Sequence, residues 1–245
     1  MTATQRFECK YVVSESTARR LRASLTSLIR PDPHAARRPD FTYPICSLYL
    51  DARGLDLYRE TVEGKKSRFK LRVRCYSDDA AVPVFLEVKR RVDGVVRKSR
   101  CPIPRAALPA VLGGDPFDAS ALTESQRRGY DEFVHLMHRT QARPKLMVRY
   151  DREAYVGAFD DDVRVTFDRR LRVLTMLDPD VRIAASGFRA VTSTGVVLEL
   201  KFSNRRRSWL AHVVDRFELQ RTSFSKYCKS VDRAGRPRGA AADVG

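Results

Sequence analysis

The chain has 245 residues, 43% of them hydrophobic, so it can bury a core as one large β-rich domain or two smaller ones. Lysine and arginine number 47 against 30 acidic residues, a formal net charge of +17. This excess predicts polyanionic partners such as nucleic acid, anionic lipid or phosphorylated small molecules. The sequence contains no apolar run long enough to span a bilayer, which argues against a transmembrane protein.

The five cysteines are scattered along the chain without a Cys-x-x-Cys pair, which argues against both a disulfide framework and a zinc site. Free thiols are typical of a reducing compartment. The first residues also lack the apolar stretch of a secretory signal. We therefore expect a cytoplasmic protein without a membrane segment of its own, and association with a membrane partner is left open.

In chain order, the first expected elements are a strand over residues 6–13 and an amphipathic helix. Ser14 is the expected N-cap, and apolar residues at helical spacing predict a helix that ends at Pro31. A loop over 31–40, a short strand over 47–51 and a helical turn over 55–59 follow. The next stretch predicts a β-hairpin, with strands over 68–74 and 85–91. A turn at Asp93 leads to an expected strand over 95–102.

The second half of the chain predicts helices and strands in alternation. Residues 104–141 have a helical pattern interrupted at 113–116, with the stronger helix over 123–140. Strands are expected over 145–154, 163–171 and 195–202, and an amphipathic helix is expected to begin at Ser203. A last short element begins at Phe224. We expect one domain over residues 5–232, followed by a disordered tail over 233–245 that is rich in Gly, Ala and Arg.

Several expected strands share a charged face, because side chains of a strand alternate between two faces. The charged and polar residues that recur at this spacing are Glu8 and Lys10; Arg68, Lys70, Arg72 and Arg74; Glu87 and Lys89; Arg164, Thr166 and Asp168; and Glu199 and Lys201. One such strand is usually just half-solvated, so the argument depends on the repetition. An antiparallel barrel covered by helices would bury the apolar faces and leave a charged lumen. Cations crowded into a lumen require an anion, and a phosphate chain fits.

Eight short motifs, in the same order, resemble those of the VTC domain, the polyphosphate polymerase domain of the vacuolar transporter chaperone complex. They are Phe7-Glu8-Cys9-Lys10, Ser47-Leu48-Tyr49-Leu50-Asp51, Arg72-Val73-Arg74, Glu87-Val88-Lys89, RYDREAY over 149–155, RVTFD over 164–168, Leu198-Glu199-Leu200-Lys201 and Ser225-Lys226-Tyr227. The VTC domain is one of the CYTH-like, or triphosphate tunnel, metalloenzymes. The resemblance implies an α+β fold in which an antiparallel β-barrel tunnel has a charged lumen and helices outside. It also implies an ATP:polyphosphate phosphotransferase, which moves the γ-phosphate of ATP to a growing polyphosphate chain.

The resemblance also implies roles for individual residues. The cations expected to act on the phosphate groups during transfer are Lys10, Arg72, Arg74, Lys89, Arg152, Arg164 and Lys226. The residues expected to contact substrate are Arg68, Lys70, Arg149, Lys201 and Tyr49. Glu199 matches the metal-binding carboxylate, and Glu87 and Glu8 are further metal candidates, with Mn²⁺ or Mg²⁺ as the expected cofactor. Arginine and lysine suit phosphate, and carboxylate oxygens suit these ions. ATP and inorganic polyphosphate are the expected partners.

One departure separates the chain from the tunnel hydrolases, whose first strand carries Glu-x-Glu-x-Lys. Arg6 stands at the first of those glutamate positions, which weakens a two-metal hydrolytic site and favours the polymerase. An inorganic or nucleoside triphosphatase with the same tunnel is the enzymatic alternative, and a non-catalytic polyphosphate-binding module is another. Nucleic acid is not an expected partner, because aromatic residues are only 9% and cations interleave with carboxylates on the strand faces.

Overall fold

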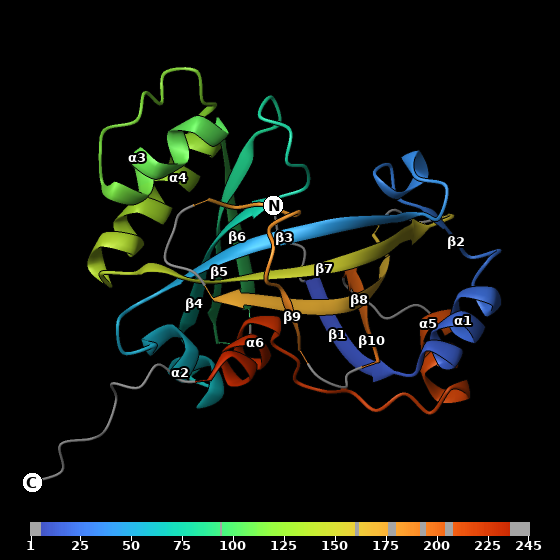
Figure 1. Ribbon diagram of the computed structural model, residues 1–245. Coiled ribbons are helices and arrows are strands. Elements are labelled where there is room, and N and C mark those ends of the chain that lie inside the picture. Colours follow the sequence, from blue (N-terminus) through green and yellow to red (C-terminus); the bar gives the residue numbers. More distant parts are fainter. Residues whose placement is uncertain are drawn as a thin grey trace, which may run out of the picture. The chain divides into compact units, whose positions relative to one another are not determined.

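The structure, a computed structural model, describes residues 6–93, 95–159, 162–175, 180–191, 195–203 and 208–235. These residues form an antiparallel, sheet-rich α+β fold (Figure 1). The strands are hydrogen-bonded in the order β1-β10-β8-β7-β3-β4-β5-β6, with β2 on β7 and β9 on β8. Among the described residues, β1 and β6 stand at the two ends of this order and are not paired with each other. The antiparallel α+β prediction is therefore confirmed, whereas closure into a barrel is not.

The contacts within the chain divide it into two compact units. The first unit comprises Met1–Pro44, Tyr150–Leu171 and Val191–Ser225, and the second comprises Ile45–Arg149, Arg172–Ala190 and Lys226–Gly245. Strands β3 (Thr42–Asp51), β7 (Arg143–Gly157) and β8 (Arg164–Thr175) contribute residues to both units. The prediction of one domain over 5–232 stays a prediction.

The first unit combines antiparallel strands with two helices. Its elements, besides its share of β3, β7 and β8, are β1 (Arg6–Val13), α1 (Glu15–Ser24), β2 (Ile29–Pro31), the 3₁₀ helix η1 (Ala35–Arg37), β10 (Val196–Ser203) and α5 (Ser208–Arg216). β10 pairs with β1 on one side and with β8 on the other. Val165 and Leu198 on these strands pack in one core with Leu21 of α1 and Leu210 of α5. The helices thus cover the apolar strand face, whereas Glu199 and Lys201 of β10 lie on the opposite face.

The second unit repeats this arrangement. Its elements, besides its share of β3, β7 and β8, are α2 (Asp56–Val62), β4 (Arg68–Cys75), β5 (Val84–Val92), β6 (Val95–Ile103), the 3₁₀ helix η2 (Arg105–Ala107), α3 (Leu108–Gly113), α4 (Glu124–Arg139), β9 (Arg189–Ala190) and α6 (Lys226–Ala234). Strands β3 to β6 are successive antiparallel neighbours. Leu71 and Leu86 pack in one core with Val111 of α3 and Phe133 of α4. Figure 1 shows α3 and α4 together beside β5 and β6.

Most predicted elements are confirmed, but α1 ends earlier than predicted. It stops at Ser24 instead of Pro31, and Ile29–Pro31 form the strand β2, which pairs with β7. The hydroxyl of Ser24 donates to the carbonyl oxygen of Leu21, and that of Thr26 donates to Ala23. Hydroxyls that bond backbone groups in this way compete with helix continuation.

Two further boundaries differ from the predictions. Ser203 is the buried last residue of β10, so it does not begin the next helix, and the described part of α5 starts at Ser208. Arg233 and Ala234, predicted to lie in the tail, still belong to α6. Residues 236–245 lie outside the described part of the chain, as does the Arg205–Arg207 stretch before α5. No described helix is long and apolar enough to cross a membrane.

Candidate functional site

The second unit carries a strongly basic sheet surface, which we call the cationic face. It consists of the polar sides of β4, β5 and β6, where residues opposite each other in the register share a face. Its members are Arg68, Lys70, Arg72 and Arg74 on β4, Glu87, Lys89 and Arg91 on β5, and Lys98 and Arg100 on β6. Eight basic side chains therefore share one surface with a single carboxylate.

The carboxylate of Glu87 organises the centre of the cationic face. It is fully buried, and Nη2 of Arg72 lies 2.7 Å and Nζ of Lys98 2.6 Å from its oxygens. Arg74 and Arg100 complete the group, with nitrogens at 3.7 and 3.5 Å. Burial alone would raise the pKa of Glu87, but these cations outweigh it and hold the pKa far below its usual range. Glu87 is therefore ionised and fixes four cations in position.

Lys98 also has a lowered pKa, which in a lysine disfavours the charged form. Burial lowers its pKa, and repulsion from Arg72 and Arg74 adds to this effect, so that its pKa falls to about 8 despite the attraction of Glu87. Lys98 lies opposite Lys89, which lies opposite Lys70, so three lysines form one row across the sheet. Like charges placed directly opposite each other repel, and an anion bound over this row would relieve the repulsion.

One edge of the cationic face ends in a cluster of tyrosines. Tyr49 on β3 lies opposite Arg72, whose Nη1 donates to its hydroxyl at 3.3 Å. Burial would raise the pKa of Tyr49, but Arg72 and its basic neighbours outweigh this and lower it. Tyr227 of α6 stacks on Tyr49, with ring centroids 4.8 Å apart, and donates to buried Asp51 at 2.6 Å. These contacts anchor the start of α6, where Lys226 is half-buried.

The first unit carries a different polar surface, which we call the mixed face. It lies on β1, β10, β8 and β7 and consists of Glu8, Lys10, Arg152, Arg164, Thr166, Asp168, Glu199 and Lys201. Glu8 lies opposite Lys201, and Lys10 lies opposite Glu199. Nζ of Lys201 is 3.0 Å from Glu199 and 3.9 Å from Glu8, while Lys10 is 3.0 Å from Glu8. The mixed face therefore carries four cations and three carboxylates, in contrast to the single carboxylate of the cationic face.

Arg152 is held on the mixed face by a two-point contact. Its Nε and Nη2 donate to the two oxygens of buried Asp168 at 2.7 and 2.8 Å. Glu199 lies 3.8 Å from the same guanidinium. Burial would lower the pKa of Arg152, but Asp168, Tyr150 and Glu199 outweigh it and raise the pKa well above its usual value. Such a bidentate pair fixes the plane of the guanidinium as well as its charge.

Two predicted site residues lie apart from these groups. Arg164 belongs to the mixed face by alternation, but its guanidinium reaches away to buried Asp32 at 2.7 Å. Arg149 in the second unit shares its strand side with the core residue Met147 and donates to the carbonyl oxygen of Ile183 at 3.0 Å. The role of Arg149 in substrate binding stays a prediction that its position does not favour.

The chain's carboxylates differ in how well they suit a divalent metal ion. No group of three or more His, Cys, Asp or Glu side chains placed to hold a metal occurs within the described ranges. Glu8 and Glu199 both contact Lys201, so their hard oxygens converge on one cation position. Glu87 is enclosed by four cations, which would repel a metal. The donor chemistry therefore fits Mn²⁺ or Mg²⁺ at Glu8 and Glu199 better than at Glu87, whose metal role stays an unsupported prediction.

Sequence reasoning missed several partners of the predicted residues. Lys98 and Arg100 surround Glu87 together with the predicted arginines, and their spacing on an expected strand was a usable signal. Asp168 was recognised as a member of a charged face, but its pairing with Arg152 was not visible. That pairing joins two strands and depends on their register, which alternation alone does not give.

Comparisons with known proteins identify the family and a related fold. The sequence profile of the VTC domain matches residues 5–234. No curated protein sequence shows a significant match. Among solved structures, the chain is similar to a protein described as a "putative adenylate cyclase" from Bacillus halodurans, with a TM-score of 0.51 and 10% identity over 90% of this chain and 94% of that chain. A likeness at this identity shows a shared fold and nothing further.

Proposed function

Because the chain belongs to the VTC domain family, we propose that it is a polyphosphate polymerase, which transfers the γ-phosphate of ATP to an inorganic polyphosphate chain. The observation that supports this function best is the cationic face, where eight basic side chains accompany a single buried carboxylate. A surface with this charge is suited to a ligand that repeats negative charges along its length. ATP, polyphosphate and a cytoplasmic location are all part of this proposal.

The cationic face would bind the phosphate groups and neutralise the charge that spreads over the transferred group. Arg72 and Arg74 offer planar forks for phosphate oxygens, and the lysine row offers point charges. Glu87 holds Arg72, Arg74 and Lys98 before the ligand arrives, so little reorganisation is needed during transfer. Preorganised charge of this kind is the main source of catalysis in phosphoryl transfer.

The transfer needs no nucleophilic side chain. A terminal oxygen of the polyphosphate chain attacks the γ-phosphorus of ATP, and the bond from that phosphorus to the β,γ-bridging oxygen breaks, so that ADP leaves with the electron pair. When bound, Mn²⁺ or Mg²⁺ would supply positive charge that offsets the charge of the phosphate groups. Glu199 and Glu8 would hold the ion at the position that Nζ of Lys201 occupies in the structure, and Arg152 would keep Glu199 oriented. Closure of the strands into a barrel around the substrate is also part of the proposal.

The proposal is tested by incubating the purified chain with ATP and Mn²⁺ and separating the products on a gel that resolves polyphosphate. Arg72→Ala should lower the rate of polymer formation by about 10²–10³-fold, the cost of one preorganised transition-state contact. Arg97→Ala is the matched control, because Arg97 lies on the same hairpin but on the opposite side of β6 from Lys98 and Arg100. Equal activity of the two variants would reject the role of the cationic face.

Hydrolysis of tripolyphosphate is the second candidate function. It is favoured by the two carboxylates Glu8 and Glu199, which converge on Lys201 as metal ligands of a hydrolase could. Release of orthophosphate from tripolyphosphate without polymer would support it. Because the similar Bacillus halodurans protein is described as an adenylate cyclase, the assay with ATP should also measure cyclic AMP and diphosphate.

A further inference from the structure

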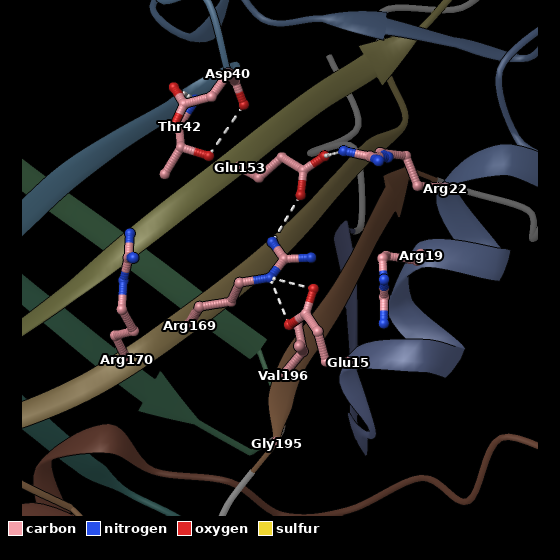
Figure 2. A pocket seen from close by; sticks show the side chains of 10 residues that line it. All are labelled: Glu15, Arg19, Arg22, Asp40, Thr42, Glu153, Arg169, Arg170, Gly195 and Val196. Carbon is pink, nitrogen blue, oxygen red and sulfur yellow. Dashed lines mark hydrogen bonds and ion pairs between the residues drawn. The ribbon is translucent and has the colours of Figure 1, made fainter.

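A second polar site lies within the first unit, on the side of the strands away from the mixed face. A pocket of about 550 Å³ is lined there by Glu153 of β7 and Arg169 of β8 (Figure 2). These two residues directly follow Arg152 and Asp168 in the sequence, so alternation places them on the other strand side. The pocket is therefore separate from the surface to which the proposed function assigns metal binding.

The floor of the pocket is a buried carboxylate whose charge is already offset. Glu153 is 2% exposed and accepts hydrogen bonds from Arg22 at 3.2 Å, from Arg169 at 2.6 Å and from the hydroxyl of Tyr155. Burial and the hydrogen bond to Glu153 raise the pKa of Tyr155, so the phenol keeps its proton. The buried carboxylate of Glu153 thus holds the guanidinium of Arg169 in a fixed position.

Arg169 also contacts a second carboxylate, that of Glu15, which unlike Glu153 is exposed to solvent. Nε of Arg169 lies 2.9 and 3.1 Å from the two oxygens of Glu15, the first residue of α1. The side chain of Glu15 is 51% exposed, so water can replace its contacts at little cost. Arg19 follows one turn later on the same helix side, and Figure 2 shows both residues lining the pocket. Among the described residues, Arg19 forms no ion pair.

We propose that the part of the pocket lined by Glu15, Arg19 and Arg169 binds a phosphate group, as orthophosphate or as a phosphate monoester. The ligand would displace Glu15 from Arg169. The Glu15 carboxylate indicates where the phosphate would bind, because its two oxygens already accept hydrogen bonds from the guanidinium of Arg169. A phosphate dianion carries more charge than a carboxylate, so it can engage Arg19 in addition to Arg169. The amino-terminal end of α1 favours negative charge at the same place.

The charged side chains of the pocket differ in how far they are already paired. Four arginines and three carboxylates line it, and one of the arginines, Arg170, is paired with Asp151 outside the lining. Two of these carboxylates, Glu15 and Glu153, are bound to arginines, and Asp40 accepts the backbone N–H of Thr42 at 3.1 Å. Displacement of Glu15 into solvent would leave both Arg19 and Arg169 facing the ligand with one competing charge removed. The site would therefore respond to phosphate independently of any chemistry on the cationic face.

The test follows the side-chain Nε–Hε signal of Arg169 in the ¹⁵N-labelled full chain by NMR, with Arg169→Lys used to assign it. Orthophosphate, diphosphate and AMP are titrated separately, each against sodium chloride at equal ionic strength. Because the signal reports on Arg169 itself, the result does not depend on whether the chain consumes ATP. Arg19→Gln and Glu15→Gln are the two informative variants, since neither residue belongs to the proposed catalytic surfaces.

We expect orthophosphate to shift the Arg169 signal at concentrations where chloride does not. Arg19→Gln should raise the half-saturating concentration about tenfold, the effect of one lost charge-assisted hydrogen bond. Glu15→Gln should lower that concentration, because the internal competitor loses its charge. A shift with AMP as well as orthophosphate would identify a site for phosphate monoesters, and a shift with orthophosphate alone a site for the free ion. An unmoved signal, an equal response to chloride, or unchanged midpoints in both variants would overturn the proposal.

Discussion

Replacement of Glu87 by glutamine tests whether a buried carboxylate organises the cationic face. Glutamine keeps the shape of the side chain but removes the charge that four cations share. Arg72 and Arg74 are only 15% and 7% exposed, so they cannot regain full hydration, whereas Lys98 and Arg100 are near 40% and can turn outward. Removal of one partner from a buried ion pair costs about 3–5 kcal/mol, and partial relaxation favours the lower end, about 3 kcal/mol.

The expected loss is measurable by urea unfolding. With a slope of about 2 kcal/mol per molar urea, a loss of 3 kcal/mol lowers the midpoint by about 1.5 M. Glu124→Gln, at a residue that is 82% exposed, is the control and should stay within about 0.5 kcal/mol of the wild type. The depressed pKa of Glu87 means that its stabilisation is complete above about pH 4.3 and is lost as the pH falls toward its folded-state value. The difference between wild type and variant should therefore shrink below about pH 4.

The same variant should separate phosphate binding from phosphoryl transfer. With Glu87 neutral, tripolyphosphate meets a more positive face and should bind more tightly, so that it stabilises the variant more than the wild type. Polymer formation should nevertheless become slower, because Arg72 and Lys98 are no longer held in place. A variant as stable as the wild type, or one that tripolyphosphate stabilises less, would refute the assigned role of Glu87.

Three further predictions concern the metal, the pH dependence and the anchoring of α6. Glu199→Gln should lose the rate increase that Mn²⁺ gives, and an unchanged Mn²⁺ titration would remove Glu199 as a ligand. Since the pKa of Lys98 is about 8, calorimetric affinity for tripolyphosphate should fall as the pH rises through 8, and Lys98→Arg should abolish that fall. As the pH rises above 8, the ligand-free protein should also become more stable. Folded Lys98 then loses its proton, whereas a lysine in the unfolded chain keeps its proton up to about pH 10.4. Tyr227→Phe should cost about 1–3 kcal/mol in thermal unfolding by removing a donor from buried Asp51, and no loss would refute the anchor.

The charged faces were predictable because their signal is local. Arg72 and Arg74 are two positions apart, so they lie on one side of β4 whichever strands pair with it. The hairpin that brings Glu87 of β5 opposite β4 follows from the polar turn between the two strands. The VTC resemblance, stated from short motifs, is confirmed by the match over residues 5–234. Family membership could therefore be read from the sequence, while the assignment of a polymerase activity remains a proposal.

What the sequence did not show depends on contacts between distant segments. Ile29 continues the apolar spacing of α1, yet it joins β2 because a partner strand is available at Gly157, more than a hundred residues later. Asp32 reaches Arg164 in the same nonlocal way. The pairing of Glu15 with Arg169 likewise requires α1 to be placed against β8, which helix periodicity does not specify.

The central claim is that this chain moves phosphate from ATP into polymer, and labelled ATP tests it most directly. With [γ-³²P]ATP, Mn²⁺ and a short polyphosphate primer, the label should appear in chains longer than the primer, with one ADP formed for each phosphate added. Label found only in orthophosphate, or label that stays in ATP while tripolyphosphate still binds, would contradict the account.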